Sequence, residues 1–263
     1  MNILEKIAAV KRDEVKSRKI TDPVSILEKS AFFNQKVPSF YEALAKPVPS
    51  VIGEFKRKSP SRGDINPGAS IPDVALGYQD AGIAAMSVLT DEEFFGGCNS
   101  DLQEVAGLVK IPVLRKDFIV DEYQVVEAKS LGAGAILLIA SILTRKEVDT
   151  LSGLALKLGM EILFEIHDLS DLDKMSKNIK IIGVNNRNLK TFDISMDNSD
   201  ELYQHLPGEC LKVAESGFQT AEDVIRMFKK GYDAFLIGER FMRSDDPGKS
   251  ASIFIDNLKK HVE

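Results

Sequence analysis

A carboxylate and an ammonium group lie two residues apart at the end of an apolar run near residue 50. The run starts at Val51 and Ile52 and passes into Glu54 and Lys56. Alternate side chains of a strand face opposite sides, so Ile52, Glu54 and Lys56 share one face. Charges at the end of a strand buried on both faces are costly unless they are paired or functional. The stretch therefore predicts either an acid–base site or a strand that leaves the core as a solvated basic loop.

Three later apolar runs end in the same way. In each, a charged residue follows an apolar one at a distance of two positions: Lys116 after Leu114, Glu165 after Leu163 and Glu215 after Val213. The opposite ends of the runs carry Pro, Ala, Gly and Ile instead. One such charge alone could equally be a solvated loop residue, but this one-sided distribution predicts that the charges converge. Lysines and carboxylates brought together can donate protons, accept them and stabilise developing charge.

Two glycines near the end of the chain indicate anion binding. Gly217 and Gly238 each lie just past an apolar run. Glycine lets backbone N–H groups approach an anion closely, although it also serves simply to make turns. Together with Ser59, which follows the first run, these glycines predict a phosphate site.

The elements that must position these residues alternate between strands and helices. Eight short apolar runs, each followed by a helical pattern, recur at an average spacing of roughly 26 residues. They cover residues 51–55, 85–89, 111–114, 135–140, 162–164, 181–184, 211–214 and 234–237. This alternation is typical of parallel strands with helical crossovers, and no GxGxxG motif follows the first strand. We therefore predict an α/β fold, a (β/α)8 TIM barrel, whose catalytic residues lie at the C-terminal ends of the strands.

Length and composition are those of an ordinary globular protein. The chain has 263 residues, a net charge of −6 and 44% hydrophobic residues. We predict one domain over residues 1–263, in which residues 1–47 form an N-terminal helical extension without the features of a secretory signal. No apolar stretch is long enough to cross a membrane. Cys98 and Cys210 lie far apart and outside any metal-ligand spacing, which predicts no metal site and a reducing cytoplasm.

Five motifs together resemble one family over most of the chain. They are Glu-Phe-Lys-Arg-Lys-Ser-Pro-Ser at 54–61, Leu-Arg-Lys-Asp-Phe at 114–118, Phe-Glu-Ile-His at 164–167, Gly-Val-Asn-Asn-Arg-Asn-Leu at 183–189 and Ala-Glu-Ser-Gly at 214–217. The chain resembles the indole-3-glycerol phosphate synthases. The resemblance implies a carboxy-lyase of tryptophan biosynthesis, EC 4.1.1.48. Such an enzyme converts 1-(2-carboxyphenylamino)-1-deoxyribulose 5-phosphate into indole-3-glycerol phosphate, carbon dioxide and water, and needs no cofactor.

The same resemblance implies a role for each site residue. Lys116 looks like the general acid that protonates the ribulose carbonyl oxygen, and Lys56 looks like the partner of the substrate carboxylate. Glu54 and Glu165 look like the acid and base carboxylates of ring closure and dehydration. Four residues would position the substrate: Asn185, Arg187, Glu215 and Ser216. Of these, Asn185 and Glu215 are counted with the catalytic residues. Phe118 would pack on the anthranilate ring, and the phosphate would be bound by Ser59, Gly217, Gly238 and the backbone of Glu239.

Three other interpretations compete with this one. A phosphoribosyl aldose–ketose isomerase barrel would carry Cys or Asp at the end of the first strand, where this chain has Glu54 and Lys56. A noncatalytic paralogue would be expected to lack some motif residues. Nucleic-acid binding would depend on Lys56-Arg57-Lys58 alone in an acidic protein. We therefore expect a small phosphorylated substrate, neither nucleic acid nor membrane as partner, and a monomer, with a dimer left open.

Two further expectations concern individual segments. His167 follows Glu165 and could act as a base, but it has no obvious partner in the sequence, and we interpret it as a structural or loop residue. Residues 60–68 are rich in Gly and Pro, and we predict that this loop is mobile and closes over the substrate.

Overall fold

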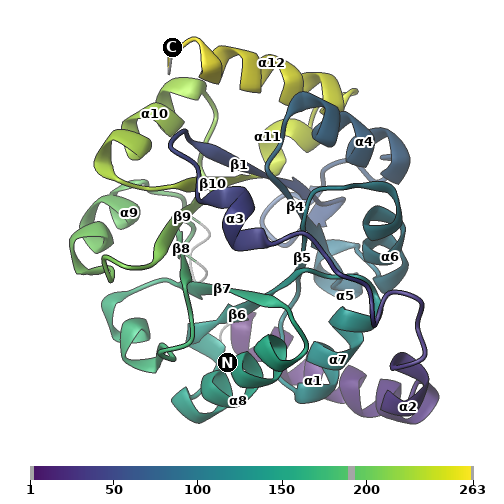
Figure 1. The fold of residues 1–263 in the computed structure, drawn as a ribbon. Coiled ribbons are helices and arrows are strands. Elements are labelled where there is room, and N and C mark those ends of the chain that lie inside the picture. The colour runs from purple at the N-terminus through teal and green to yellow at the C-terminus, as the bar shows by residue number, and fades with distance from the viewer. Residues whose placement is uncertain (1–2, 189–192, 262–263) are drawn as a thin grey trace.

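Eight parallel strands close into a barrel in the computed structural model, which describes residues 3–188 and 193–261 (Figure 1). Around the barrel, in chain order, the strands are β1 (Ser50–Phe55), β4 (Ala85–Leu89), β5 (Val113–Lys116), β6 (Ala135–Ile139), β7 (Glu161–Ile166), β8 (Ile181–Asn185), β9 (Leu211–Glu215) and β10 (Ala234–Ile237). β10 pairs with β1 and completes the ring, so that Leu236 lies opposite Ile52. The predicted (β/α)8 barrel and all eight predicted strands are confirmed.

Helices surround the barrel and fill its connections (Figure 1). The longer ones are α4 (Ile71–Ala81), α6 (Asn99–Leu108), α7 (Glu122–Ser130), α8 (Arg145–Lys157), α10 (Ala221–Lys230) and α12 (Pro247–Lys259). The shorter ones are α5 (Glu92–Phe95), α9 (Asp197–Leu202), α11 (Glu239–Met242) and the 3-10 turns η1 (Ala140–Ile142), η2 (Leu169–Lys174) and η3 (Tyr203–His205). The connection between β1 and α4 also contains a small hairpin of β2 (Lys58–Ser59) and β3 (Gly63–Asp64).

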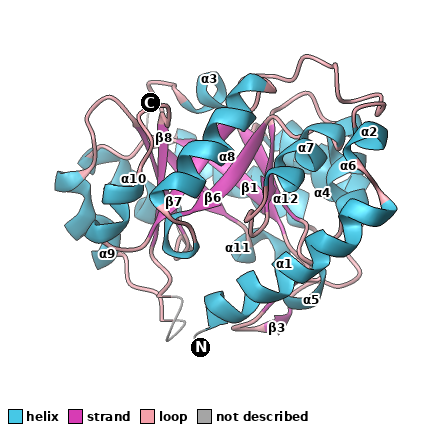
Figure 2. Ribbon diagram, turned by 90° about the horizontal axis from the view of Figure 1, so that it is seen from below, coloured by secondary structure: helices cyan, strands magenta, loops and turns pink. Residues whose placement is uncertain are grey.

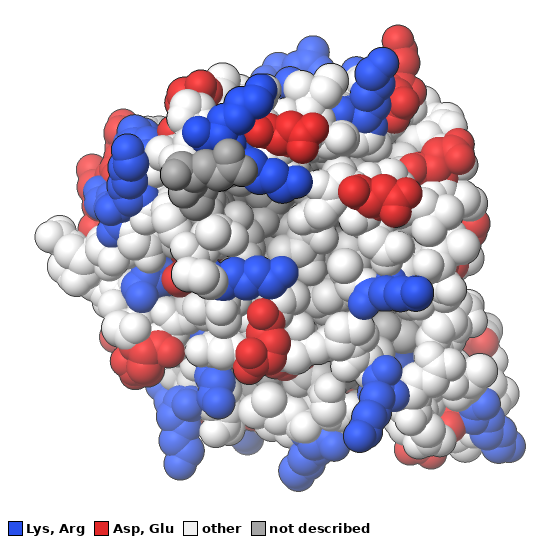
Figure 3. All heavy atoms as spheres, turned by 45° about the horizontal axis from the view of Figure 1, so that its top comes forward, with Lys and Arg blue, Asp and Glu red and all other residues white. Residues whose placement is uncertain are grey.

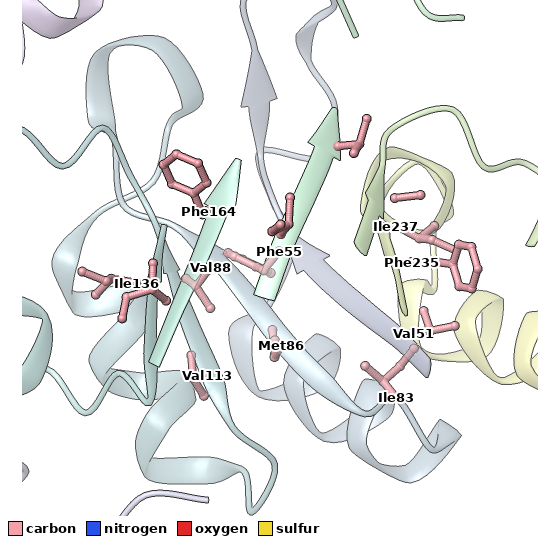
Figure 4. Packing of buried hydrophobic residues seen from close by; sticks show 14 of the residues in the cluster. Val51, Phe55, Ile83, Met86, Val88, Val113, Ile136, Phe164, Phe235 and Ile237 are labelled. Carbon is pink, nitrogen blue, oxygen red and sulfur yellow. The ribbon is translucent and has the colours of Figure 1, made fainter. Parts of the chain in front are cut away.

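Alternation along the strands divides the apolar residues into two cores. Ile52, Leu114, Leu163 and Val213 belong to one buried cluster, which fills the interior of the barrel. Their neighbours on the other face of each strand pack outward against the helices, and Figure 4 shows Val51, Phe55, Val113, Phe164 and Phe235 in that second cluster. The shared faces predicted from two-residue spacing are therefore confirmed, and the charged residues that continue the inner faces point into the mouth of the barrel.

β5 begins and ends two residues later than predicted. We expected residues 111–114, whereas the strand runs from Val113 to Lys116. Pro112 has no N–H group to donate to the ladder, so regular pairing starts after it. The strand continues instead into its charged end, where Lys116 lies opposite Leu89 of β4. The position of the Lys116 backbone is thus set by the sheet rather than by a loop.

Two of the three N-terminal helices cover opposite ends of the barrel (Figure 2). The three are α1 (Ile3–Thr21), α2 (Val24–Leu27) and α3 (Phe40–Leu44). α3 lies at the end where the strands begin, and its Phe40 and Leu44 join the interior cluster there. Glu161, the first residue of β7, accepts hydrogen bonds from the Ser39 hydroxyl and the Tyr41 N–H. α1 lies at the opposite end. Within the described residues, none of the helices combines the length and apolar character needed to cross a membrane.

Candidate active site

All thirteen residues predicted for the site line one cavity at the C-terminal ends of the strands. The structure brings together the six predicted catalytic residues, Glu54, Lys56, Lys116, Glu165, Asn185 and Glu215. It brings to the same cavity the seven predicted substrate-binding residues, Ser59, Phe118, Arg187, Ser216, Gly217, Gly238 and Glu239. Leu189, the last residue of the 183–189 motif, lies outside the described residues. The functional roles of these residues remain predictions.

Lys116 connects two buried carboxylates at the centre of the cavity. Its Nζ donates to Glu215 Oε2 at 2.5 Å and to Glu165 Oε2 at 3.1 Å. Both carboxylates are almost fully buried, whereas 13% of the lysine side chain remains exposed. Gly183 of β8 makes room for this arrangement, since a Cβ at that position would lie 2.1 Å from Glu215 Oε1.

Burial and charge together separate the pKa values of these groups. Burial lowers the pKa of Lys116, but Glu215, Glu165 and Glu54 outweigh that effect and raise it. Burial raises the pKa of Glu165, yet Lys116 and His167 overcome this and lower it. Burial and repulsion from Glu165 raise the pKa of Glu215 in spite of Lys116. The two carboxyl groups that share the Lys116 ammonium therefore have pKa values shifted in opposite directions, a combination suited to proton transfer.

A second lysine and carboxylate face the cavity from β1. Lys56 Nζ lies 2.5 Å from Glu54 Oε2, and 14% of the lysine side chain is exposed. Gly238, just past β10, is needed here because a Cβ at that position would lie 2.5 Å from Glu54 Oε2. The pair predicted from the first strand therefore exists, and Lys56 is open to a ligand on one side.

Asn185 organises the end of β8. Its Oδ1 accepts hydrogen bonds from the Arg187 N–H and from the Ser216 hydroxyl, each at 3.0 Å. Ser216 has a φ of 69°, a left-handed conformation that is uncommon for a residue other than glycine. Gly217 follows with a φ of 97°. This turn directs the backbone after β9 toward the cavity.

The side of the cavity expected to hold phosphate is rich in arginine. Arg187 donates to the Ser61 hydroxyl at 3.0 Å and reaches Glu239 Oε2 at 3.5 Å. Arg62 lies 3.3 Å from the other oxygen of Glu239. Ser59, Gly217 and Gly238 line the same cavity. Ser61 was not singled out from the sequence, although it lies within the 54–61 motif.

The apolar wall of the cavity was only partly predicted. Phe118 was expected there, and its ring centroid lies 5.9 Å from that of Phe95. Ile3, Leu4 and Ile7 of α1 also line the cavity, as does Phe95. Their helical spacing is visible in the sequence, but spacing does not reveal which end of the barrel the helix covers.

His167 has a polar contact that the sequence analysis did not anticipate. Its Nε2 lies 3.3 Å from Glu165 Oε1, the oxygen not bound by Lys116. Its backbone N–H donates to Asp171 Oδ2 at 3.0 Å. The signal was the two-residue spacing itself, because Glu165 and His167 fall on the same side of the chain. In residues 3–188 and 193–261, no three His, Cys, Asp or Glu side chains are grouped to hold a metal ion.

These observations define the class of the protein: a (β/α)8 barrel whose acid and base groups converge at the C-terminal ends of its strands. The family model of indole-3-glycerol phosphate synthase matches residues 4–253. An indole-3-glycerol phosphate synthase of Albidiferax ferrireducens is 42% identical over 252 residues, covering 94% of this chain and 96% of that protein. One from Bacteroides thetaiotaomicron is 41% identical over 258 residues, covering 98% and 99%. The chain belongs to the indole-3-glycerol phosphate synthase family, a family of decarboxylating carbon–carbon lyases.

Solved structures with low sequence identity share the fold alone. KGPDC from Streptococcus mutans aligns with a TM-score of 0.62 at 12% identity, covering 81% of this chain and 98% of that one. A chain of the tryptophan synthase complex from Pyrococcus furiosus aligns with a TM-score of 0.60 at 13% identity, covering 80% and 98%.

Proposed function

We propose that this protein closes the indole ring of 1-(2-carboxyphenylamino)-1-deoxyribulose 5-phosphate and releases indole-3-glycerol phosphate, carbon dioxide and water. The observation that carries the proposal is the position of Lys116 between Glu215 and Glu165 inside the cavity. A lysine kept charged in this way can stabilise an oxyanion and then protonate it. Family membership supports the same reaction.

Ring closure comes first in this proposal. The aromatic carbon that bears the carboxylate attacks the ketone carbon of the sugar chain, and a carbon–carbon bond forms. The carbonyl oxygen becomes negative, and Lys116 gives it a proton. Glu215 and Glu165 hold the Lys116 ammonium in place before the step. Phe118 and Phe95 pack against the aromatic ring on the apolar side of the cavity.

Loss of carbon dioxide and loss of water follow. The bond to the carboxylate breaks, its electron pair returns to the ring system, and carbon dioxide leaves. Until then Lys56 pairs with the carboxylate, because its ammonium is open to the cavity. The new hydroxyl then leaves as water with the help of Lys56, while the neighbouring carbon loses a proton to Glu54 or Glu165. Asn185, Ser216 and Arg187 position the substrate, and Ser59, Gly217, Gly238 and the Glu239 backbone bind its phosphate.

The proposal includes neither a nucleic acid nor a membrane as partner, and no cofactor or metal in any step. The net charge of −6 opposes binding to a polyanion. On the face drawn in Figure 3, Lys and Arg side chains are interspersed with Asp and Glu. Cys98 and Cys210 are free thiols, which fits the reducing cytoplasm.

The test follows indole fluorescence after the purified protein is mixed with the substrate in buffer that contains a chelator and no cofactor. We expect rapid product formation by the unaltered protein. Lys116→Ala should lower turnover by about 10²- to 10⁴-fold, the usual contribution of a general acid, with a native far-UV spectrum. Lys146→Ala, at an exposed position of α8, is the matched control and should be fully active.

Two outcomes would contradict the proposal. Near-normal turnover by Lys116→Ala would remove Lys116 from the reaction. An unaltered protein that binds the substrate tightly but forms no indole would instead be a noncatalytic paralogue.

A further inference from the structure

Within the described residues of α1 (Ile3–Thr21), Lys11 is the one charged residue that is buried. Only 1% of the side chain is exposed. Its Nζ lies 2.8 Å from Glu14, 3.0 Å from Asp91 and 3.1 Å from Asp117. Burial lowers the pKa of Lys11, but Asp117, Asp91 and Glu14 outweigh that effect and raise it. A buried charge with this many partners is costly to disturb, and the reaction proposed above makes no use of it.

Each of the two aspartates also holds a segment of the cavity wall. Asp117 Oδ1, the oxygen that faces Lys11, accepts the N–H of Phe118 at 2.8 Å. Asp91 uses Oδ2 for Lys11 and Oδ1 for the N–H of Phe94 at 2.8 Å, which caps α5. α5 ends at Phe95, whose ring contacts that of Phe118. One ammonium therefore joins the segments that carry both aromatic rings.

The same ammonium also connects these segments to α1. Ile7 lies one helical turn before Lys11 and lines the cavity together with both rings. Asp117 directly follows Lys116, the residue proposed as general acid. Without Lys11, Asp91 would lose its cation, whereas Asp117 would keep Arg115, which lies 3.0 Å from its Oδ2. The buried Asp91 would then be uncompensated beside Asp117, and the position of α5 relative to Phe118 would no longer be fixed.

We propose that Lys11 is a positioning residue for Phe95 and Phe118, the aromatic wall of the active site. The two rings are placed to pack on the substrate's ring only while α1 is bound to the barrel through Lys11. The inference rests on the proposed function, because the ring in question belongs to that substrate. Lys11 does not itself contact the substrate. It acts through Asp117 and Asp91 on Phe118 and Phe95.

A second ion pair of α1 offers a control for simple loosening of the helix. Lys19 lies 2.8 Å from Asp121, and both side chains are partly exposed. Neither residue lines the active-site cavity. Lys19→Met thus removes an ion pair between α1 and the barrel that does not involve the aromatic wall. Lys11→Met removes the ion pairs that position the aromatic wall.

The experiment measures KM and kcat for the substrate, together with inhibition by inorganic phosphate, in the full-length protein and its variants. Lys11→Met should raise KM by about tenfold, the size of one lost aromatic contact, while the inhibition constant of phosphate stays within about twofold. Lys11→Arg keeps the positive charge and should recover part of the loss. Lys19→Met should leave both constants unchanged.

Asp91→Asn keeps the side-chain cap of α5 and weakens only the ion pair with Lys11. It replaces Lys11→Met as the test if that variant does not fold. It should raise KM in the same direction by a smaller factor. An unchanged KM in Lys11→Met, or in Asp91→Asn where Lys11→Met does not fold, would overturn the inference. So would equal losses of substrate and phosphate binding, because those indicate general loosening. An unaltered protein without turnover would refute the proposed function instead.

Discussion

At the scale of single residues, the active site depends on space as much as on charge. Gly183 has no side chain, and the Glu215 carboxylate occupies the space that a Cβ would take there. The Glu54 carboxylate occupies the corresponding space beside Gly238. Both glycines are visible in the sequence, but what they make room for is not, because the contact joins different strands. The charged residues were predictable, since two-residue spacing assigns them to the inner faces. Their partners, such as Glu215 for Lys116, required the closed barrel.

Gly183→Ala tests this use of space. The added Cβ would lie 2.1 Å from Glu215 Oε1, while Lys116 holds the other carboxylate oxygen. We expect a loss of about 1–3 kcal/mol in the free energy of unfolding, typical of overpacking, and at least a tenfold loss of turnover. Denaturant unfolding and the indole assay measure the two effects.

Gly153→Ala in α8 is the matched control, because its Cβ would meet nothing within 4 Å. It should leave turnover unchanged and stabilise the helix slightly. Equal activity of the two variants would show that Glu215 tolerates displacement.

The raised pKa of Glu215 predicts how the free energy of unfolding changes with pH. Burial and Glu165 raise its pKa to about 8 in the folded protein, from an ordinary value of 4.5. Its stabilising contribution is complete below pH 4.5 and is lost as the pH rises through 8, because the folded state alone retains the proton in that window. Glu215→Gln has no proton to lose. Its free energy of unfolding relative to the unaltered protein should therefore increase between pH 5 and 8, by at most about 1.4 kcal/mol per pH unit. A difference that is constant with pH would contradict the assignment.

At the scale of elements, the strands were the most predictable part of the chain. Short apolar runs with charges at one end indicated both their number and their orientation. β5 lies two residues later than predicted. The prediction followed the apolar run, which includes Ile111 and Pro112, whereas strand pairing starts only at Val113. The placement of α1 could not be predicted, since its spacing defines an apolar face but not the surface that receives it. His167 was treated as isolated because its contact with Glu165 depends on how the strand ends.

The connection between β1 and α4 carries the element-scale prediction. Ser61 and Arg62 tie it to Arg187 and Glu239, across the mouth of the cavity. We predict that residues 60–68 close over bound substrate. Amide hydrogen exchange in this segment should slow when a phosphate-bearing substrate analogue is added. Exchange in α8, on the outside of the barrel, should not change. Equal exchange of residues 60–68 with and without the analogue would argue against closure.

At the scale of the whole molecule, we predict a monomer. The large apolar side chains exposed by more than a third are spread over several elements, among them Leu76 of α4, Leu108 of α6, Leu156 of α8 and Ile253 of α12. Ile20, at the end of α1, and Val24 and Ile26 of α2 are close in sequence, but three side chains make a small surface. Stable dimers bury a contiguous apolar surface, so a distribution of this kind disfavours one. Light scattering should give a mass near 29.0 kDa at micromolar concentration. Twice that mass, independent of dilution, would establish the dimer.

The seam between β1 and β10 has a consequence for how the protein is made. β1 emerges early from the ribosome, yet one of its two partners is the last strand of the barrel. At about 5 to 20 residues per second, synthesis of residues 56–233 takes roughly 10 to 40 seconds, during which that edge of β1 stays unpaired. An unpaired apolar edge is a template for aggregation. The nascent chain is thus most vulnerable before its final strand appears. Glu54 and Gly238 meet only when this seam closes, so the active site and the finished barrel arise in the same event.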